Sequence, residues 1–178
     1  GLVLWTVTLA GGRSGRSSST VEDVGSTPVI SENKVFAANS TGRIVALNLD
    51  SGERIWSAPH GTTSLIWPAG GSVFFVNDLS QIVRLDDRNG SIVWATDLPG
   101  FLKIDRLRSN EVVVHHGPLL AGGRLFIASS DGKMRIFDPV SGALKLTLDI
   151  PGGATTNSVI ADGTLYVVSK TGKLHAYR

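Results

Sequence analysis

The sequence has no cysteine among its 178 residues. A disulfide framework, a cysteine nucleophile and a thiolate metal site are therefore excluded within it, although this absence does not fix the compartment. No apolar run approaches the length that a transmembrane helix needs. No signal peptide is visible, but the sequence begins within a repeat, so this says nothing about export. The formal net charge is only +2, which gives no reason to expect nucleic-acid binding on a basic surface.

Catalytic motifs are also missing. The glycine pairs at residues 11–12 and 122–123 do not open helices, and no lysine follows them at the offset of a phosphate-binding loop. No serine stands on a sharp turn between a strand and a helix. The histidines lack acidic or cysteine partners at ligand spacing, and adjacent histidines on a strand point to opposite faces. The sequence therefore predicts no catalytic, cofactor-binding or metal-binding residue.

Glycine is abundant instead, with 21 residues, and it marks tight turns between short apolar runs. The pattern is complete in residues 27–56, where Gly, Asn, Asp and Ser separate runs of β-branched and aliphatic residues. Such runs indicate short β-strands joined by hairpins. The four strands expected there are residues 27–30, 34–38, 43–47 and 54–56.

Further copies of this pattern follow along the chain. The second begins 38 residues on, counted from Val35 to Val73, and a third and a fourth continue to the end of the sequence. A period near 40 residues with four strands per unit is typical of propeller blades. The expected fold class is all-β, a β-propeller of four-stranded antiparallel blades, with about four blades in this sequence.

The expected blades are residues 26–58, 65–96, 112–149 and 155–178, preceded by residues 1–9 as the outer strand of an earlier blade. The last blade lacks its own outer strand. Either the chain is the carboxy-terminal part of a longer propeller, or its first strand completes the last blade, within one chain or between two. Four blades are few for a closed ring, so we favour part of a ring of about eight. Because an isolated half ring exposes apolar faces, we expect it to self-associate or to pair with the missing half.

Three tryptophans, Trp5, Trp56 and Trp94, each follow a glycine by four residues at the end of an outer strand. An indole at this position fits between neighbouring blades, and its N–H reaches a backbone carbonyl. Stacking on a flat cofactor is the alternative, but recurrence in the repeat favours a structural role. Leu146 takes the place of the tryptophan in the third blade, and Trp67 lies outside this register, with packing as its default interpretation.

Residues 98–111 form an insertion between the second and third blades, which adds 14 residues to the spacing of the first two. Its apolar residues, among them Phe101, are interleaved with three basic residues, Lys103, Arg106 and Arg108. An exposed loop that mixes apolar and basic residues is a candidate partner-binding surface. The alternative, a loop that folds its apolar residues onto the blade edge, stays open.

Residues 46–56 and 84–94 resemble the tryptophan-docking repeat of pyrroloquinoline-quinone (PQQ) propellers, Ala-x-Asp-x-x-Thr-Gly-x-x-x-Trp. The match is specific in the second half of each repeat, with an asparagine for the usual aspartate in the first copy. The repeat-motif residues are Trp5, Gly42, Asn48, Gly52, Trp56, Asp86, Gly90, Trp94, Gly132, Asp138, Gly142 and Gly172.

Residues 23–28, 76–85 and 162–178 further resemble the carboxy-terminal half of the BamB family, propeller lipoproteins of the outer-membrane β-barrel assembly machine. The resemblance implies an eight-bladed, non-catalytic scaffold in the periplasm, associated with the outer membrane through a lipid anchor outside this segment. It also implies binding to BamA-like POTRA domains during outer-membrane protein assembly. In that family an acidic pair is implicated in docking. Asp23 matches its first member, whereas Gly25 stands at the second.

The alternative function is part of a PQQ-dependent quinoprotein alcohol dehydrogenase, which shares the repeat. Those enzymes hold PQQ with a vicinal disulfide and bind calcium through Asp, Asn and Glu, whereas this sequence has no cysteine. We therefore expect a protein that is not an enzyme, with no cofactor and no metal. The expected partner-binding residues are Asp23, Phe101, Lys103, Arg106 and Arg108.

Overall fold

The computed structural model describes residues 1–9, 25–102 and 111–178. Within these ranges every regular element is a β-strand. No helix there is long and apolar enough to cross a membrane.

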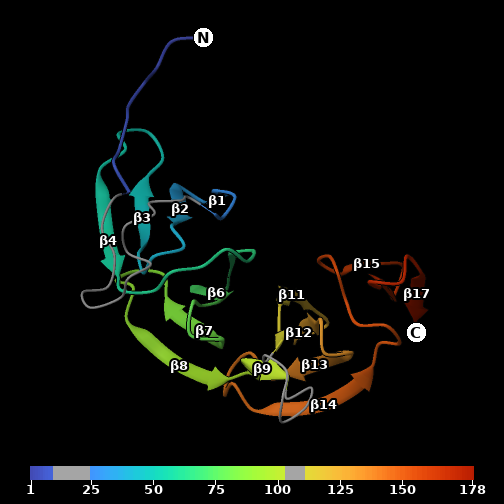
Figure 1. Ribbon diagram of the computed structural model, residues 1–178. Coiled ribbons are helices and arrows are strands. Elements are labelled where there is room, and N and C mark those ends of the chain that lie inside the picture. Colours follow the sequence, from blue (N-terminus) through green and yellow to red (C-terminus); the bar gives the residue numbers. More distant parts are fainter. Residues whose placement is uncertain (10–24, 103–110) are drawn as a thin grey trace. The chain divides into compact units, whose positions relative to one another are not determined.

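The first sheet contains β1 (Val29–Ser31), β2 (Lys34–Ala38), β3 (Ile44–Asn48) and β4 (Arg54–Ala58). The strands are ordered β1-β2-β3-β4, and neighbouring strands are antiparallel. Figure 1 shows these four labelled strands side by side. β1 begins at Val29, two residues after the expected start at residue 27. The β3–β4 turn closes because Asn48 Oδ1 accepts hydrogen bonds from the backbone N–H groups of Asp50 and Ser51, both at 2.9 Å.

The remaining strands repeat this arrangement. The second sheet has the order β5 (Trp67–Ala69), β6 (Ser72–Val76), β7 (Gln81–Asp86), β8 (Ile92–Asp97). The third has the order β11 (His115–Ala121), β12 (Arg124–Ser129), β13 (Lys133–Phe137), β14 (Leu144–Asp149). The fourth has three strands within the described residues, β15 (Val159–Ala161), β16 (Thr164–Val168) and β17 (Leu174–Tyr177). A separate two-stranded sheet joins β9 (Phe101–Leu102) to β10 (Glu111–Val112). The predicted fold class, an all-β propeller of four-stranded antiparallel blades, is confirmed.

The sheets pack into two compact units, residues 1–78 with 83–95, and residues 79–82 with 96–178. In the first unit, Phe36, Ile44 and Trp56 of the first sheet are buried together with Val73 and Phe75 of the second. In the second unit, buried apolar residues of the third and fourth sheets form a corresponding cluster, which includes Met134, Ile136, Leu165 and Val167.

Consecutive residues of the inner strands are buried, so side chains on both faces of these strands are covered. All five residues of β6 are buried, and so are four of the five in both β2 and β3. Strands covered on both faces contain continuous apolar runs in place of alternation. The outer strands differ, since five of the six residues of β14 are exposed.

Candidate functional site

The Trp56 side chain joins two blades in the first unit. Its Nε1 donates a hydrogen bond to the Asp87 carbonyl oxygen at 2.8 Å, and its ring lies 6.0 Å from that of Phe36. A Cβ atom on Gly90 would stand 2.6 Å from the Trp56 ring, so only a residue without a side chain lets the indole lie this close. Trp56 is therefore held by its ring contacts and by one hydrogen bond.

Trp5 lies in the same way on the first sheet. Its Nε1 donates to the Leu49 carbonyl oxygen at 3.0 Å, and a Cβ on Gly52 would stand 2.6 Å from its ring. Val7 and Leu9 pack beside it, against the face that contains Val35, Ala37, Val45 and Leu47. Residues 1–9 are not assigned to a strand. We interpret these tryptophans as structural residues. An indole that bonds to a backbone carbonyl oxygen and packs against a glycine is the geometry that this role requires.

The other repeat-motif residues lie in turns or beside them. Asp86 Oδ1 accepts from the Arg88 backbone N–H at 2.9 Å, and Asp138 Oδ1 accepts from the Ser141 backbone N–H at 2.8 Å. These hydrogen bonds favour the ionised form, so the pKa of both carboxyl groups is lowered; for Asp86 the Arg88 guanidinium is the largest cause. Trp94 packs 6.0 Å from Phe74. Glycines 42, 132, 142 and 172 have positive φ angles.

A buried polar network lies in the third sheet, and sequence reasoning missed it. His115 Nδ1 is 2.8 Å from Ser129 Oγ, and His115 Nε2 is 2.9 Å from the Pro99 carbonyl oxygen. A carbonyl oxygen only accepts, so Nε2 carries the proton and Nδ1 accepts from the serine hydroxyl. Arg135 Nη1 donates to Ser129 Oγ at 3.1 Å and its guanidinium pairs with Asp131.

This serine–histidine pair resembles a hydrolytic dyad, but Ser129 is 0% exposed, so no substrate reaches it. The network satisfies buried polar groups within the blade, which is the requirement that buried hydroxyl and guanidinium groups impose. No local pattern could have revealed it, because His115 meets Ser129 only through the β11–β12 register.

Acid is expected to destabilise the protein through His115. Burial, with the Arg135 charge nearby, lowers the pKa of His115 below its ordinary value of 6.5, and burial also lowers that of His116. The unfolded chain then binds more protons below about pH 6.5, so stability is complete above that pH and falls as the pH drops below it. Urea midpoints at pH 7.5 and 5.5 measure the loss. The His115→Gln variant should lose less stability over this interval than wild type, and an unchanged loss would contradict the assignment.

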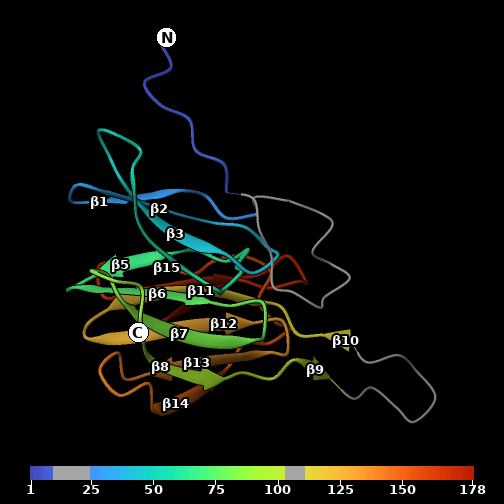
Figure 2. The ribbon, with the colours of Figure 1, turned by 90° about the vertical axis from the view of Figure 1, so that its left-hand side faces the viewer.

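The insertion forms the β9–β10 pair, which extends beyond the ends of β12 and β13 in Figure 2. Phe101 and Val112 are paired across its two strands and are 63% and 58% exposed. Glu111 forms an ion pair with Lys170 at 3.1 Å. The other four expected partner-binding residues, Asp23, Lys103, Arg106 and Arg108, lie outside the described residues. Of the expected partner-binding residues, the structure therefore describes Phe101, which is exposed next to Val112 of β10.

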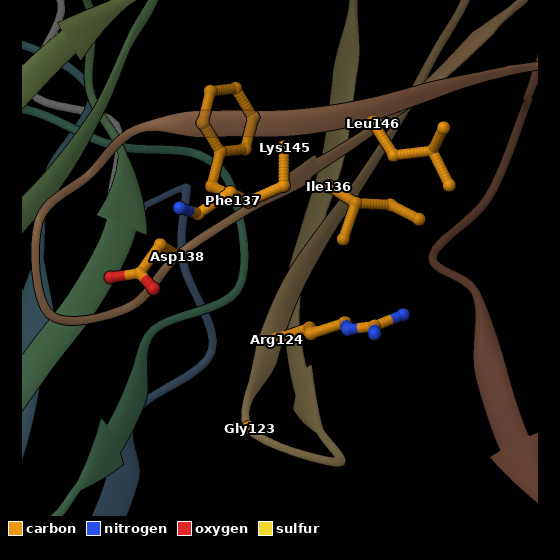
Figure 3. Close-up of a pocket in the computed structure, with 7 residues that line it drawn as sticks. All are labelled: Gly123, Arg124, Ile136, Phe137, Asp138, Lys145 and Leu146. Atoms are coloured by element: carbon orange, nitrogen blue, oxygen red, sulfur yellow. The ribbon is translucent and has the colours of Figure 1, made fainter.

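Two cavities accompany these features. One of about 320 Å³ lies in the first unit and is lined by Trp67 and Pro68 of β5 together with Val29 and Ile30 of β1. The other, of about 410 Å³, lies on the third sheet beside Leu146 (Figure 3). In the part of the chain that the structure describes, no three His, Asp or Glu side chains gather as metal ligands would.

Comparison with known proteins gives a consistent set of similarities. The family model described as outer membrane protein assembly factor BamB matches residues 1–96, more than half of the chain. The protein of that name from Legionella pneumophila is 23% identical over 175 residues, covering 98% of this chain and 43% of its own length. That from Shewanella oneidensis is 25% identical, with 98% and 42% covered. The crystal structure of BamB from Moraxella catarrhalis has a TM-score of 0.76 at 15% identity, over 98% of this chain and 49% of that one.

The chain thus spans less than half the length of these two relatives. The matches to both relatives nevertheless cover nearly the whole of this chain. Since the family model covers more than half of the chain, the chain belongs to the BamB family of outer membrane protein assembly factors.

Proposed function

We propose that this chain is a non-catalytic scaffold that binds partner proteins during the assembly of β-barrel outer-membrane proteins. Its membership of the BamB family carries the proposal. The proposed location is the periplasm, associated with the outer membrane through a lipid anchor outside residues 1–178. The proposed partners are POTRA domains of a BamA-like barrel-forming subunit.

The proposed blade organisation follows from the repeat geometry. Trp5 meets Leu49 and Gly52 as Trp56 meets Asp87 and Gly90. This equivalence supports residues 1–9 as the outer strand of a further blade. This chain, with its four blade sheets, matches 49% of the Moraxella protein, which supports a ring of about eight blades in the intact molecule.

The partner-binding surface is proposed to include Asp23 and the insertion, where Phe101 and Val112 are exposed side by side. An exposed aromatic residue next to another apolar side chain is a frequent anchor in protein interfaces. The ion pair of Glu111 with Lys170 joins the β10 strand to the fourth sheet, which supports a fixed position for this anchor. The alternative of a quinoprotein dehydrogenase rests on the shared repeat alone.

The test measures binding of the 178-residue chain to immobilised POTRA domains of the BamA protein from the same organism. Phe101→Asp should weaken binding about tenfold or more, since it removes an apolar anchor and adds a charge. Asp23→Lys should weaken it independently. Val140→Asp is the matched control, because Val140 is 73% exposed on the β13–β14 turn, away from the insertion. Absence of wild-type binding, or equal binding by Phe101→Asp and wild type, would count against the proposal.

A further inference from the structure

The base of the insertion lies between the end of β8 and the start of β11. Leu98 and Val113, one on each side of this base, are buried. The Val113 N–H donates to the Gly100 carbonyl oxygen at 3.0 Å and joins the outgoing segment to the returning one. The exposed pair of Phe101 and Val112 follows directly on this base. The position of that pair therefore depends on how the base is held.

A hydrogen bond from the third sheet reaches the base. His115 Nε2, on β11, donates to the Pro99 carbonyl oxygen at 2.9 Å. Proline has no backbone N–H, so the carbonyl is the only backbone group through which Pro99 can be held by a hydrogen bond. Pro99 comes two residues before Phe101, where β9 begins. His115 is therefore placed to fix the chain just before it enters β9.

The imidazole of His115 is itself fixed by the packed sheet. Its Nδ1 accepts from Ser129 Oγ on β12 at 2.8 Å, and Arg135 Nη1 on β13 donates to the same hydroxyl oxygen at 3.1 Å. His115 is 9% exposed and Ser129 is 0% exposed. A buried ring whose two nitrogens are both bonded is fixed in orientation, so the third sheet determines the direction of the bond to Pro99.

A proton on Nδ1 would disturb this arrangement. Protonated Nδ1 is a donor, so the hydroxyl hydrogen of Ser129 would lose its acceptor in a site closed to solvent. An unsatisfied buried donor costs more than the net gain from a typical hydrogen bond. The arrangement therefore requires the neutral imidazole.

The charged groups around the ring act in both directions. Burial is the largest influence and lowers the pKa of His115, and the positive charges of Arg135 and His116 lower it further. The bond to the Pro99 carbonyl and the carboxylate of Asp131 favour the proton, but that carboxylate is already paired with Arg135. The net result is a pKa below the ordinary 6.5.

We propose that His115 is a positioning residue for the partner-binding surface of the insertion. Through the Pro99 carbonyl it holds Phe101 and Val112 in place, and it does so only as the neutral imidazole. This inference rests on the proposed function, in which that surface binds a partner protein.

Acid is then expected to loosen the surface at its base. Opening the base exposes the ring and removes the main cause of its lowered pKa, so the open form binds the proton more tightly. The base is held fully above about pH 6.5 and is released as the pH falls through the lowered pKa of the bonded ring. Between pH 7.5 and 5.5, the equilibrium constant for closing the base falls by at most about tenfold, the limit for a bonded ring that takes up no proton.

Amide hydrogen exchange measured by NMR tests the positioning without a partner. The Val113 N–H reports on the base, whereas the Asp138 N–H, bonded to the Ala143 carbonyl oxygen in the β13–β14 turn, reports on the third sheet alone. From pH 7.5 to 5.5, the protection factor of Val113 should fall several-fold relative to that of Asp138, up to about tenfold. In His115→Gln the ratio should stay constant, because the amide donates to Pro99 but does not titrate.

Binding to the immobilised POTRA domains tests the consequence for the partner. His115→Leu fills the site but removes the donor, so it should weaken binding about fivefold at pH 7.5, the usual effect of one lost hydrogen bond. His115→Gln should bind within about twofold of wild type. At pH 5.5 the wild type should lose affinity relative to His115→Gln. Both proteins meet the same POTRA domains, so titration of the partner cancels in this ratio.

His175→Gln is the matched control. His175 lies on β17 of the fourth sheet, where its ring is 6.4 Å from that of Tyr177. The variant removes one imidazole without changing the base of the insertion. It should keep the wild-type affinity at pH 7.5 and the wild-type loss at pH 5.5. The wild-type exchange series needs no variant, so it tests the inference even where His115→Leu fails to fold.

A constant ratio of Val113 to Asp138 protection in the wild type, or the same fall in His115→Gln, would overturn the inference. Equal POTRA binding by His115→Leu and wild type would overturn it as well. The two proposals fail separately. If Val113 protection follows His115 but the wild type does not bind POTRA domains, the proposed partner is wrong and the positioning stands. If the wild type binds and Val113 protection is independent of His115, the positioning is wrong and the partner stands.

Discussion

Replacing Trp56 with alanine is expected to lower the free energy of unfolding by about 3–5 kcal/mol, the usual cost of removing a large buried aromatic side chain. Trp56 is only 7% exposed and belongs to the cluster that the first two sheets share. Its removal leaves a cavity between Phe36 and Gly90 that neither sheet can fill without moving. Urea unfolding followed by circular dichroism measures the loss.

Two further variants separate packing from hydrogen bonding. Trp56→Phe keeps most of the ring contacts and loses only the bond to the Asp87 carbonyl oxygen, which still accepts from Lys34. A loss of about 1 kcal/mol is expected beyond the change in volume. Trp5→Ala should cost less than Trp56→Ala, because Trp5 is only partly buried. Equal losses for Trp5→Ala and Trp56→Ala would show that burial of the ring is not the main source of the lost unfolding free energy.

Replacing Gly153 with alanine is expected to destabilise the second unit by about 3 kcal/mol. Gly153 has a φ of 70°, and a Cβ there would stand 2.3 Å from the Ser130 carbonyl oxygen. The loop cannot move aside without cost, because the Gly153 carbonyl oxygen accepts from the Lys170 N–H and the Ala154 N–H donates to Ser129. The energetic costs of the strained φ and of the backbone contact therefore add.

Gly163→Ala is the matched control. Gly163 has nearly the same φ, 69°, but a Cβ there would meet no atom within 4 Å. This substitution should cost about 1 kcal/mol, the penalty of the left-handed conformation alone. The difference between the two variants in urea unfolding then measures the contact with Ser130. Losses of the same size at both positions would show that the backbone conformation, and not the contact, limits Gly153.

Only part of the candidate surface on the insertion could be predicted from the sequence. Phe101 could be chosen from its position in an added, mixed apolar and basic stretch, and the structure leaves it exposed. Its partner Val112 could not, because the pairing of β9 with β10 depends on a hairpin register that the sequence does not specify. Asp23 came from family resemblance and lies outside the described residues.

The cavity beside Leu146 could not be predicted from the sequence either. The missing tryptophan was visible as a departure from the repeat, but its consequence was not. Whether a smaller residue leaves a cavity depends on how the neighbouring strands pack, and here a cavity of about 410 Å³ lies beside Leu146.

The spacing of strands and turns was enough to establish the blades, because each turn is local: Asn48 and Asp138 bond to backbone groups within three residues, and glycine supplies the positive φ. The buried His115 network depends on contacts between residues far apart in the chain. Those contacts arise only when register and sheet packing bring the strands together. Hydrogen bonds within a turn can be predicted from neighbouring residues, whereas burial and cavities are determined by how the sheets pack.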